Sequence, residues 1–385
     1  MKKILIIGPI GDFGGRELES GFMASALSSK YIVDICTTGS LSNKSQVFNF
    51  NKKQKVFSLA DLACQQYLVL KLLALLSYVK NSCKGVWSSY VNNNIAKYFF
   101  NYNKKRLLIV QKLVAQYDVI FICAQLSSSL VNDIITFAKL NNKKILFRTT
   151  GTISEGSFPY IENVNSFIHH SKVNASNLEK FKNHDYVIID QCAFNEKELL
   201  NVSLSQSGIH NFLILGRLSP EKGVEELISF FLQVCLKNDT LYLAGNGPLE
   251  NYLRNKYKEA DNIKFLGFIE REHLSDLFNR IDCLIICSPE ESGPLVGVES
   301  MAAGKLIIST RVGAMTERLA ESLNQFWFDY NDLESFKKTV QSVKLLNQDE
   351  VKSISDSLRD CYLKDYSLDK IKKKYLSTVN GVLNK

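Results

Sequence analysis

Two glutamates around a predicted helix start are the residues of this chain best placed to do chemistry. They lie in the stretch SPEESGPLVGVE, where Glu291 and Glu299 have seven residues between them. The apolar run 281–287 predicts a short buried strand before this stretch, and VGVESMAAG predicts a helix start after it. One carboxylate is therefore expected in the loop and the other in the first turns of the helix. The open amides of a helix start favour a phosphate and a nearby carboxylate suits ribose hydroxyls, so the pattern indicates a nucleotide-sugar site.

Three neighbouring segments strengthen this interpretation, because two glutamates alone often are surface charges around a helix start. Residues 212–223, FLILGRLSPEKG, predict a strand and then a turn that carries Arg217 and Lys222. Residues 241–248, LYLAGNGP, predict another strand that closes on a glycine turn. Residues 263–267, IKFLG, predict a third strand before the helical pattern REHLSDLFNRID. Together with the glutamates, these strand-to-turn segments favour a binding site over scattered surface charge.

Residues 212–320 resemble the nucleotide-binding half of retaining glycosyltransferase family 4, also called glycosyltransferases group 1. The GR…KG turn, the GxGP turn and the E-x7-E element stand in the family's order and approximate spacing. The resemblance implies an α/β fold of GT-B architecture, with two Rossmann-like doubly wound domains facing across a cleft and a C-terminal helix crossing back to the N-terminal domain. The sequence departs from the family's commoner EGFG form at Ser292, Gly293 and Pro294.

The resemblance also implies roles for individual residues. Arg217 and Lys222 are expected to bind the diphosphate of the donor and to act in catalysis. Glu291 is expected to contact the donor sugar hydroxyls, or the positive charge that develops near the anomeric carbon, and Glu299 the ribose hydroxyls. The further donor-binding residues that it implies are Gly14, Gly15, Asn246, Phe268, Gly293, Pro294, Leu295 and Val296. The family retains anomeric configuration, and the usual proposal is a front-face displacement in which the leaving phosphate helps to deprotonate the acceptor.

No divalent metal and no other cofactor is expected. The sequence contains no Asp-x-Asp motif, so fixed cations and helix amides are expected to stabilise the diphosphate leaving group. Among the nine cysteines, Cys283 and Cys287 lie in one predicted strand, where a four-residue offset is a poor geometry for metal ligands. The cysteines are predicted to be reduced and mostly buried, as in a cytosolic protein.

Length and composition predict two globular domains. The chain has 385 residues, 45% hydrophobic residues and a mean hydropathy of −0.06, which is typical of an ordinary soluble protein. We expect an N-terminal acceptor-binding domain at 1–205, a nucleotide-sugar-binding domain at 206–362 and a closing helix at 363–385 that packs back on the first domain. The N-terminal KKILIIG is too short for a secretory signal and predicts a first strand instead.

A strongly basic helical insertion is predicted at about 52–112. It holds eleven basic residues against the single acid Asp61, a local balance of +10, whereas the whole chain carries +8. QQYLVLKLLALLSYV is a long helical pattern. Its apolar part is broken by Gln65, Gln66 and Lys71 and is shorter than the roughly 18–20 residues that span a bilayer. A basic helical pair bearing aromatic residues is typical of an anionic membrane interface. The alternative is an ordinary helix with its lysines in water, and no nucleic-acid module is recognisable.

The acceptor site is expected in the first domain, at the carboxyl end of the predicted strand 143–147. The acceptor contacts predicted from this location are Arg148, Thr149, Thr150 and Glu155. Simple turn chemistry is the alternative for this loop. Many family members carry a histidine at the position where this sequence has Thr150. Because that histidine is absent here, the resemblance assigns no catalytic histidine to this chain. The adjacent His169 and His170 would point to opposite faces of a strand and are expected to be structural.

These observations predict a retaining, metal-independent glycosyltransferase with a UDP-sugar donor, or a GDP-sugar next in order. The acceptor is expected to be a saccharide, lipid-linked, in the assembly of bacterial surface polysaccharide such as O-antigen or capsule. Such an enzyme would be cytoplasmic and peripheral at the inner face of the plasma membrane. The alternatives are a non-catalytic GT-B scaffold subunit and another GT-B activity, such as a phosphorylase or an epimerase. The sequence specifies neither the base, the linkage nor the oligomeric state.

Overall fold

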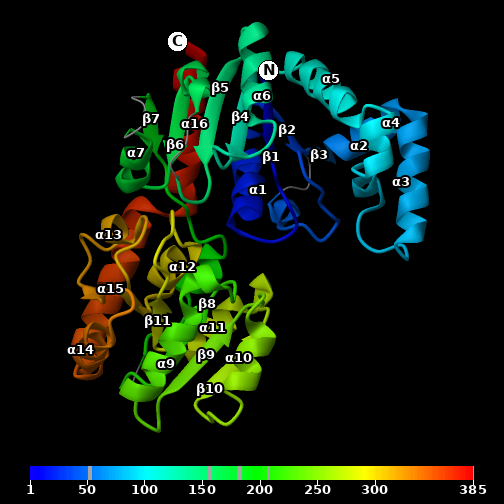
Figure 1. Ribbon diagram of the computed structural model, residues 1–385. Coiled ribbons are helices and arrows are strands. Elements are labelled where there is room, and N and C mark those ends of the chain that lie inside the picture. Colours follow the sequence, from blue (N-terminus) through cyan, green and yellow to red (C-terminus); the bar gives the residue numbers. More distant parts are fainter. Residues whose placement is uncertain (51–53, 154–157, 180–183, 206–207, 385) are drawn as a thin grey trace. The chain divides into compact units, whose positions relative to one another are not determined.

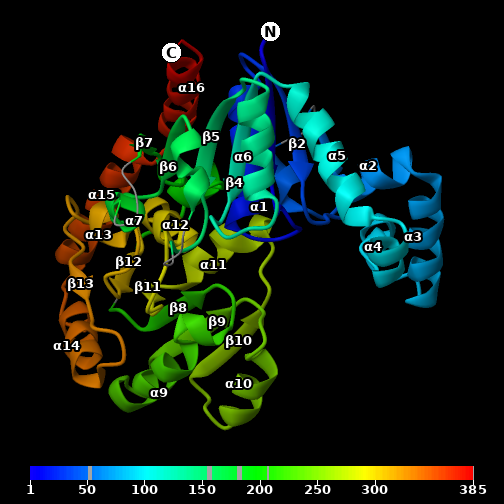
Figure 2. The same ribbon diagram turned by 45° about the horizontal axis from the view of Figure 1, so that its top comes forward.

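A computed structural model describes residues 1–50, 54–153, 158–179, 184–205 and 208–384, and these residues form two compact units (Figures 1 and 2). The first unit comprises Met1–His169, Ala175–Ile189 and Lys372–Lys385, and the second His170–Asn174 and Asp190–Ile371. The chain thus passes into the second unit at Asp190, earlier than the predicted boundary after residue 205. It returns at Lys372, within the last helix, so that this helix contributes to the first unit.

The first unit is built on a seven-stranded parallel sheet with the order β3-β2-β1-β4-β5-β6-β7. Its strands are β1 (Lys3–Gly8), β2 (Ile32–Thr37), β3 (Lys55–Ser58), β4 (Val119–Ala124), β5 (Lys144–Thr149), β6 (Ser166–His169) and β7 (Tyr186–Ile188). All six residues of β4 are buried, because helices cover both faces of a parallel sheet and its inner strands become continuously apolar. The sequence did not predict β3, whose four residues KVFS are too short to show a strand period.

The helices of the first unit follow the strands, and four of them lie together at the β3 edge of the sheet in both views, namely α2 to α5 (Figures 1 and 2). The helices are α1 (Gly15–Leu27), α2 (Leu59–Gln66), α3 (Leu68–Lys80), α4 (Asn94–Phe99), α5 (Tyr102–Ala115), α6 (Val131–Leu140), α7 (Lys172–Glu179) and α16 (Leu368–Asn384), with the short 3-10 helices η1 (Gln46–Asn49), η2 (Trp87–Val91) and η3 (Pro159–Asn163). The predicted basic insertion corresponds to α2 to α5, and its first residues, 52 and 53, lie outside the described part.

The helix predicted from the pattern QQYLVLKLLALLSYV is confirmed from Leu68 onward as α3, whereas Gln65 and Gln66 belong to α2. The backbone of Tyr67 is extended, with φ −129° and ψ 102°, and the two helices on either side of it, α2 and α3, are bent by 120°. Within the described residues no single helix has the length and apolar character to cross a membrane, and this bent pair meets those criteria only when taken together. A capping box of Ser58 and Asp61 starts α2, which fixes the direction of that helix at the end of β3.

The second unit is built on a six-stranded sheet with the order β10-β9-β8-β11-β12-β13. Its strands are β8 (Asn211–Leu215), β9 (Thr240–Ala244), β10 (Ile263–Gly267), β11 (Cys283–Ile286), β12 (Leu306–Ser309) and β13 (Phe326–Trp327), all in parallel pairs. Its helices are α8 (Glu196–Leu200), α9 (Val224–Val234), α10 (Glu250–Lys256), α11 (Leu274–Arg280), α12 (Leu295–Ala303), α13 (Met315–Arg318), α14 (Leu333–Lys344) and α15 (Gln348–Asp365), with η4 (Pro220–Lys222) and η5 (Arg271–His273). The two sheets with their helices confirm the predicted two-domain α/β fold.

A buried polar cluster connects three segments of the first unit that are far apart in the sequence. Arg148 lies in β5, is fully buried and forms an ion pair of 2.6 Å with Glu19 of α1. Tyr375 of α16 donates a 2.6 Å hydrogen bond to the same carboxylate, and burial raises the pKa of this tyrosine well above its ordinary value. The predicted loop position of Arg148 is therefore wrong. Its side chain faces the interior, which argues against the predicted acceptor contact.

Replacing Arg148 by Met should destabilise the first unit strongly, because the Glu19 carboxylate would stay buried without its counter-ion. Breaking a buried pair in this way costs about 3–5 kcal/mol. Replacing Tyr375 by Phe removes only one hydrogen bond to the carboxylate and should cost about 1–3 kcal/mol. Urea unfolding followed by circular dichroism would compare the two variants. If Tyr375→Phe lowered the free energy of unfolding as much as Arg148→Met or more, the ion pair would not be the main contributor to the stability of this cluster.

Candidate active site

The predicted nucleotide-sugar site lies at the carboxyl ends of the strands of the second unit. The loop after β11 carries Glu291, which is half-buried, and the second turn of α12 carries Glu299, which is buried. The two carboxylates therefore stand as predicted, one in the loop and one in the helix. In an open parallel sheet this edge is where ligands bind.

Lys222 and Glu291 are brought together although 69 positions separate them. Their side chains form an ion pair between Lys222 Nζ and Glu291 Oε1, and Ser288 Oγ lies 3.2 Å from the same oxygen. Gly223 follows Lys222 in this turn and has φ +65°. A Cβ atom added at this position would lie 2.7 Å from the carbonyl oxygen of Cys287. A side chain at residue 223 would thus clash with the end of β11. Arg217, at the start of the same turn, is exposed.

The start of α12 presents its backbone amides without a side-chain cap. Pro294 is the N-cap residue, and its side chain forms no cap hydrogen bond. Gly293, Leu295 and Val296 are half-buried, so this short stretch of backbone borders on solvent. A helix start of this kind favours an anion through its free amides and its dipole.

Glu299 has an unusual electrostatic environment. Burial raises the pKa of its carboxyl to about 7, and the charges of Arg271 and Arg318 work against this rise. A carboxyl group that titrates near neutral pH can donate a hydrogen bond in one form and accept two in the other. This is a property suited to hydroxyl groups, which both donate and accept.

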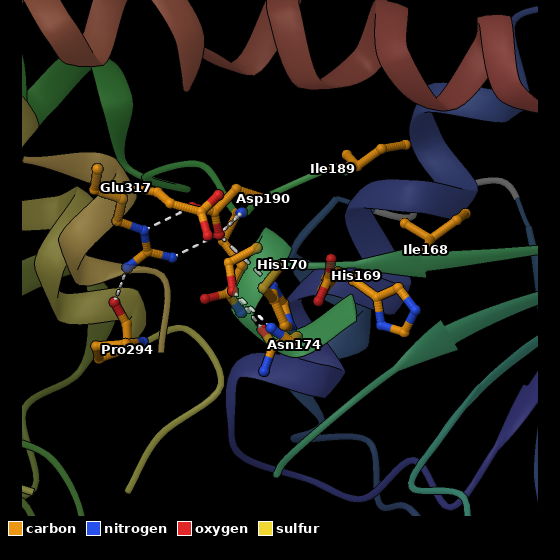
Figure 3. A network of polar contacts seen from close by, with 12 residues as sticks. Ile168, His169, His170, Asn174, Ile189, Asp190, Pro294 and Glu317 are labelled. Carbon is orange, nitrogen blue, oxygen red and sulfur yellow. Dashed lines mark hydrogen bonds and ion pairs between the residues drawn. The ribbon is translucent and has the colours of Figure 1, made fainter. Parts of the chain in front are cut away.

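Arg318 is the residue of this site that the sequence analysis missed. It is wholly buried, and its guanidinium group donates to both oxygens of Asp190, at 2.7 and 2.6 Å, and to the carbonyl oxygen of Pro294. Burial raises the pKa of Asp190, but the Arg318 charge and its hydrogen bonds outweigh this and hold that pKa below its usual range. Figure 3 shows this network together with His170, whose Nδ1 lies 3.7 Å from Asp190.

The guanidinium of Arg318 lies directly behind the start of α12. A Cβ atom added to Gly293 would lie 3.1 Å from Arg318 Nη2, and one added to Gly297 would lie 2.5 Å from Met315 Sδ and 3.2 Å from Arg318 Nη1. The two glycines therefore permit the close approach of the charge to the helix. Arg318 also interacts electrostatically with Glu291. A lone arginine after a glycine turn carries no distinguishing sequence signal, but the glycine spacing of four could have indicated close packing.

The turn after β12 holds the Glu291 loop in place. Thr310 Oγ1 donates a 2.7 Å hydrogen bond to the carbonyl oxygen of Ser288, and the amide of Ala314 donates a 3.0 Å bond to that of Ser292. Gly313 has φ +49° and a Cβ position 2.4 Å from the Ser292 oxygen, so only glycine fits between the two loops. The loop is thus fixed by hydrogen bonds to its carbonyl oxygens at Ser288 and Ser292.

Of the remaining predicted residues, Asn246 lies beside the Arg217 turn, because its carbonyl oxygen accepts a 3.0 Å hydrogen bond from the amide of Leu218. Asn246 and Phe268 are exposed in the turns that follow β9 and β10. Gly14 and Gly15 start α1 of the first unit, where the Gly14 amide donates a 2.9 Å hydrogen bond to Gln46 Oε1. Their donor role stays a prediction.

The predicted acceptor residues all belong to the first unit. Thr149 is buried and its hydroxyl lies 2.9 Å from His169 Nδ1, while Thr150 accepts a 3.2 Å hydrogen bond from Arg16. Glu155 lies outside the described residues. Among the residues that are described, no group of three or more His, Cys, Asp or Glu side chains could hold a metal ion.

Comparison with known proteins identifies the second unit. A family model described as glycosyl transferases group 1 matches residues 196–357. These residues are similar to that family. An uncharacterized glycosyltransferase of Methanocaldococcus jannaschii is 31% identical over 119 residues, which are 30% of each chain. The N-acetyl-alpha-D-glucosaminyl L-malate synthase of Bacillus anthracis is 24% identical over 287 residues, 68% of this chain and 72% of the relative.

The fold of the whole chain matches that of solved glycosyltransferase structures. A crystal structure of Anabaena HepE in complex with UDP and glucose aligns with a TM-score of 0.75 at 15% identity, covering 99% of this chain and 100% of that one. The chain spans less than two thirds of the length of the first curated relatives that it matches. The matched part is 30%, 52% and 26% of the length of these three relatives. The residues that match the group 1 model lie within the second unit and include Lys222, Glu291 and Glu299.

Glu291→Gln should bind UDP a few-fold more tightly than the unaltered protein, whereas Lys222→Ala should bind it about tenfold or more weakly. Glu291→Gln removes a carboxylate that pairs with Lys222 and repels an anion. Lys222→Ala removes a charge-assisted contact to the phosphate of about 1.5–3 kcal/mol. Isothermal titration calorimetry measures both affinities. Glu290→Gln, an exposed neighbour in the same loop, is the matched control. Weaker UDP binding by Glu291→Gln would contradict the competition between carboxylate and phosphate.

Glu299→Gln should change how stability depends on pH. Because the folded pKa of Glu299 is raised to about 7, the folded protein holds a proton that the unfolded chain releases at lower pH. Its stabilising contribution is therefore complete below about 4.5 and is lost as pH rises to about 7, by at most about 1.4 kcal/mol per pH unit. The free energy of unfolding of Glu299→Gln, relative to that of the unaltered protein, should therefore increase over this pH window and then level off. Exposed Glu259→Gln is the control, and parallel pH curves for the two variants would refute the shift.

Proposed function

We propose that this protein is a glycosyltransferase that moves a sugar from a nucleotide diphosphate sugar to a saccharide acceptor. The observation that carries the proposal is the Lys222–Glu291 ion pair, in the same unit as an uncapped helix start and the buried Glu299. The similarity of residues 196–357 to the group 1 family supports it. A cation, open amides and two carboxylates in different environments match the phosphates, the donor sugar and the ribose of such a substrate.

Catalysis in this proposal depends on stabilising the leaving diphosphate. Lys222 exchanges its carboxylate partner for a phosphate oxygen, and Arg217 adds a second cation from the same turn. The freed Glu291 then faces the donor sugar, where positive charge develops as the glycosidic bond breaks. The acceptor hydroxyl attacks from the side of the leaving group and gives its proton to a phosphate oxygen, so that the anomeric configuration is retained. Fixed cations and amides make this reaction metal-independent, because they stabilise the charge that a metal would otherwise bind.

The donor in this proposal is a UDP-sugar, with a GDP-sugar next in order. The structural similarity to Anabaena HepE, a protein crystallised with UDP, with UDP and glucose and with UDP-glucose, favours the uridine nucleotide. Phe268 follows the positive-φ Gly267 at the end of β10 and is 45% exposed. An aromatic ring in this position is suited to stack on the base.

The acceptor in this proposal is a lipid-linked saccharide at the cytoplasmic face of an anionic membrane. The support is the basic insertion, in which residues 54–112 hold nine basic side chains and one acidic one, a net charge of +8. Such a charge is worth about 1 kcal/mol per Lys or Arg near an anionic surface. The reaction would then belong to the assembly of bacterial surface polysaccharide.

A transfer assay tests the proposal. The purified protein is incubated with UDP-glucose, UDP-galactose, UDP-N-acetylglucosamine or GDP-mannose and a panel of saccharide and lipid-linked acceptors, with and without EDTA. We expect acceptor-dependent release of UDP that EDTA leaves unchanged and that Lys222→Ala lowers about tenfold or more, since the lost contact stabilises the transition state. Nucleotide binding without transfer to any acceptor would favour a scaffold subunit, and loss of transfer in EDTA would overturn the metal-independent mechanism.

A further inference from the structure

Helix α3 of the first unit carries two apolar faces, and the described residues of the chain cover only one of them. Leu70 and Ala74 are fully buried in the core of the unit, together with Leu59 and Ala63 of α2. The opposite side of α3, here called the outer face, is apolar as well and is exposed. It consists of Leu68, Val69, Leu72, Leu75, Leu76 and Val79.

The outer face is a continuous stripe. At 3.6 residues per turn its six residues fall within an arc of about 120° and extend over about 17 Å of helix. The side chains of Leu68, Leu76 and Val79 are 70%, 68% and 66% exposed. A large exposed apolar patch marks an interaction site in a soluble protein. The neighbouring helix α4 packs against α3 and adds exposed Ile95, Tyr98 and Phe99.

Lysines border this stripe on both sides. On the same helical projection, Lys71 lies next to one edge of the arc and Lys80 next to the other, and both are exposed. No polar side chain interrupts the arc between them. Figures 1 and 2 show α3 at the outside of the α2 to α5 group, away from the sheet in both views.

We infer that the outer face of α3 inserts into the surface of an anionic lipid bilayer, with the helix parallel to the membrane and Lys71 and Lys80 at the level of the headgroups. An apolar arc with cations at its edges is the pattern of helices that lie in a bilayer interface. Long lysine side chains reach from such an edge to the phosphates while their methylene groups stay in the apolar layer.

Other occupants fit this surface less well. A second copy of the chain would set the same basic surface against itself in a two-fold interface, because such interfaces use one patch on both subunits, and the +8 charge of residues 54–112 would repel. A protein partner is expected to form about one hydrogen bond per 100–200 Å², and the arc offers no side chain for this. Insertion of both α2 and α3 across the membrane is disfavoured because Leu59, Ala60 and Ala63 of α2 are buried against the core.

This inference deepens the proposed function by assigning its membrane contact to one helix face. Vesicle binding, however, does not depend on glycosyl transfer. Transfer to a soluble acceptor without any vesicle binding would overturn the inference alone. Vesicle binding through α3 without transfer to any acceptor would overturn the proposed function alone.

The test is flotation of the full chain with vesicles of phosphatidylcholine containing phosphatidylglycerol. We expect binding that weakens with salt and is lost with pure phosphatidylcholine. The double variant Leu72→Gln plus Leu76→Gln should lower the partition coefficient about tenfold or more, a change of about 1.4 kcal/mol, without loss of folding because both residues are exposed. The matched control is Leu323→Gln plus Leu345→Gln, two leucines of the second unit that are 60% and 83% exposed.

Two further variants separate the charges from the apolar arc. Lys71→Glu plus Lys80→Glu should weaken binding to the anionic vesicles, whereas the exposed pair Lys338→Glu plus Lys352→Glu should not. Leu76→Trp should add tryptophan fluorescence that brominated lipid quenches, and Leu345→Trp should not. Equal flotation of the Leu72/Leu76 variant and its control would overturn the inference. So would a dimer of the unaltered protein in solution that the Leu72/Leu76 variant dissociates, since the surface would then join two copies.

Discussion

The candidate donor site depends on one buried cation. Arg318 is only 1% exposed, and an arginine in that position is stable only if its charge and its N–H groups are satisfied inside the protein. Asp190 supplies the charge with two hydrogen bonds and Pro294 supplies a carbonyl oxygen. One of these partners is the residue at which the chain enters the second unit, and the other is the N-cap of α12. The position of the helix start that we propose to bind phosphate therefore follows from neutralising Arg318.

The same constraint accounts for the departure from the family's EGFG form. In the ESGP sequence found here, Gly293 occupies the place of the phenylalanine, and a Cβ at residue 293 would approach both Arg318 Nη2 and His170 at 3.1–3.3 Å. A large side chain would have to displace the buried ion pair. The contacts expected of this loop use backbone amides, which glycine provides equally well. The departure thus reflects packing around Arg318, and the electrostatic character of the helix start is preserved.

The sequence predicted those features that depend on neighbouring residues and missed those that depend on distant ones. Apolar runs such as 281–287 identified buried parallel strands, and glycine turns identified the strand ends at which Lys222 and Glu291 meet. Arg148 was placed in a loop because a charged residue after an apolar run usually ends a strand, and its buried partner Glu19 lies 129 positions away. The role of Arg318 was equally invisible, since it depends on Asp190. The break at Tyr67 leaves no mark, because neither glycine nor proline interrupts the pattern there.

Helix α3 shows why an apolar pattern alone does not reveal the environment of a helix. A helix that is apolar on all sides is expected to be buried on all sides, yet the core of the unit covers only the side of Leu70 and Ala74. The exposed leucines increase the free energy of the protein in water, since each would gain about 1.5–3 kcal/mol on full burial. A sequence that keeps this arc free of charge, while placing Lys71 and Lys80 at its borders, is adapted to an environment that is apolar in the middle and anionic at the edge. In our proposal the outer face of α3 is therefore covered by a bilayer outside the chain, in contrast to Arg318 of the second unit, whose partners lie within the chain.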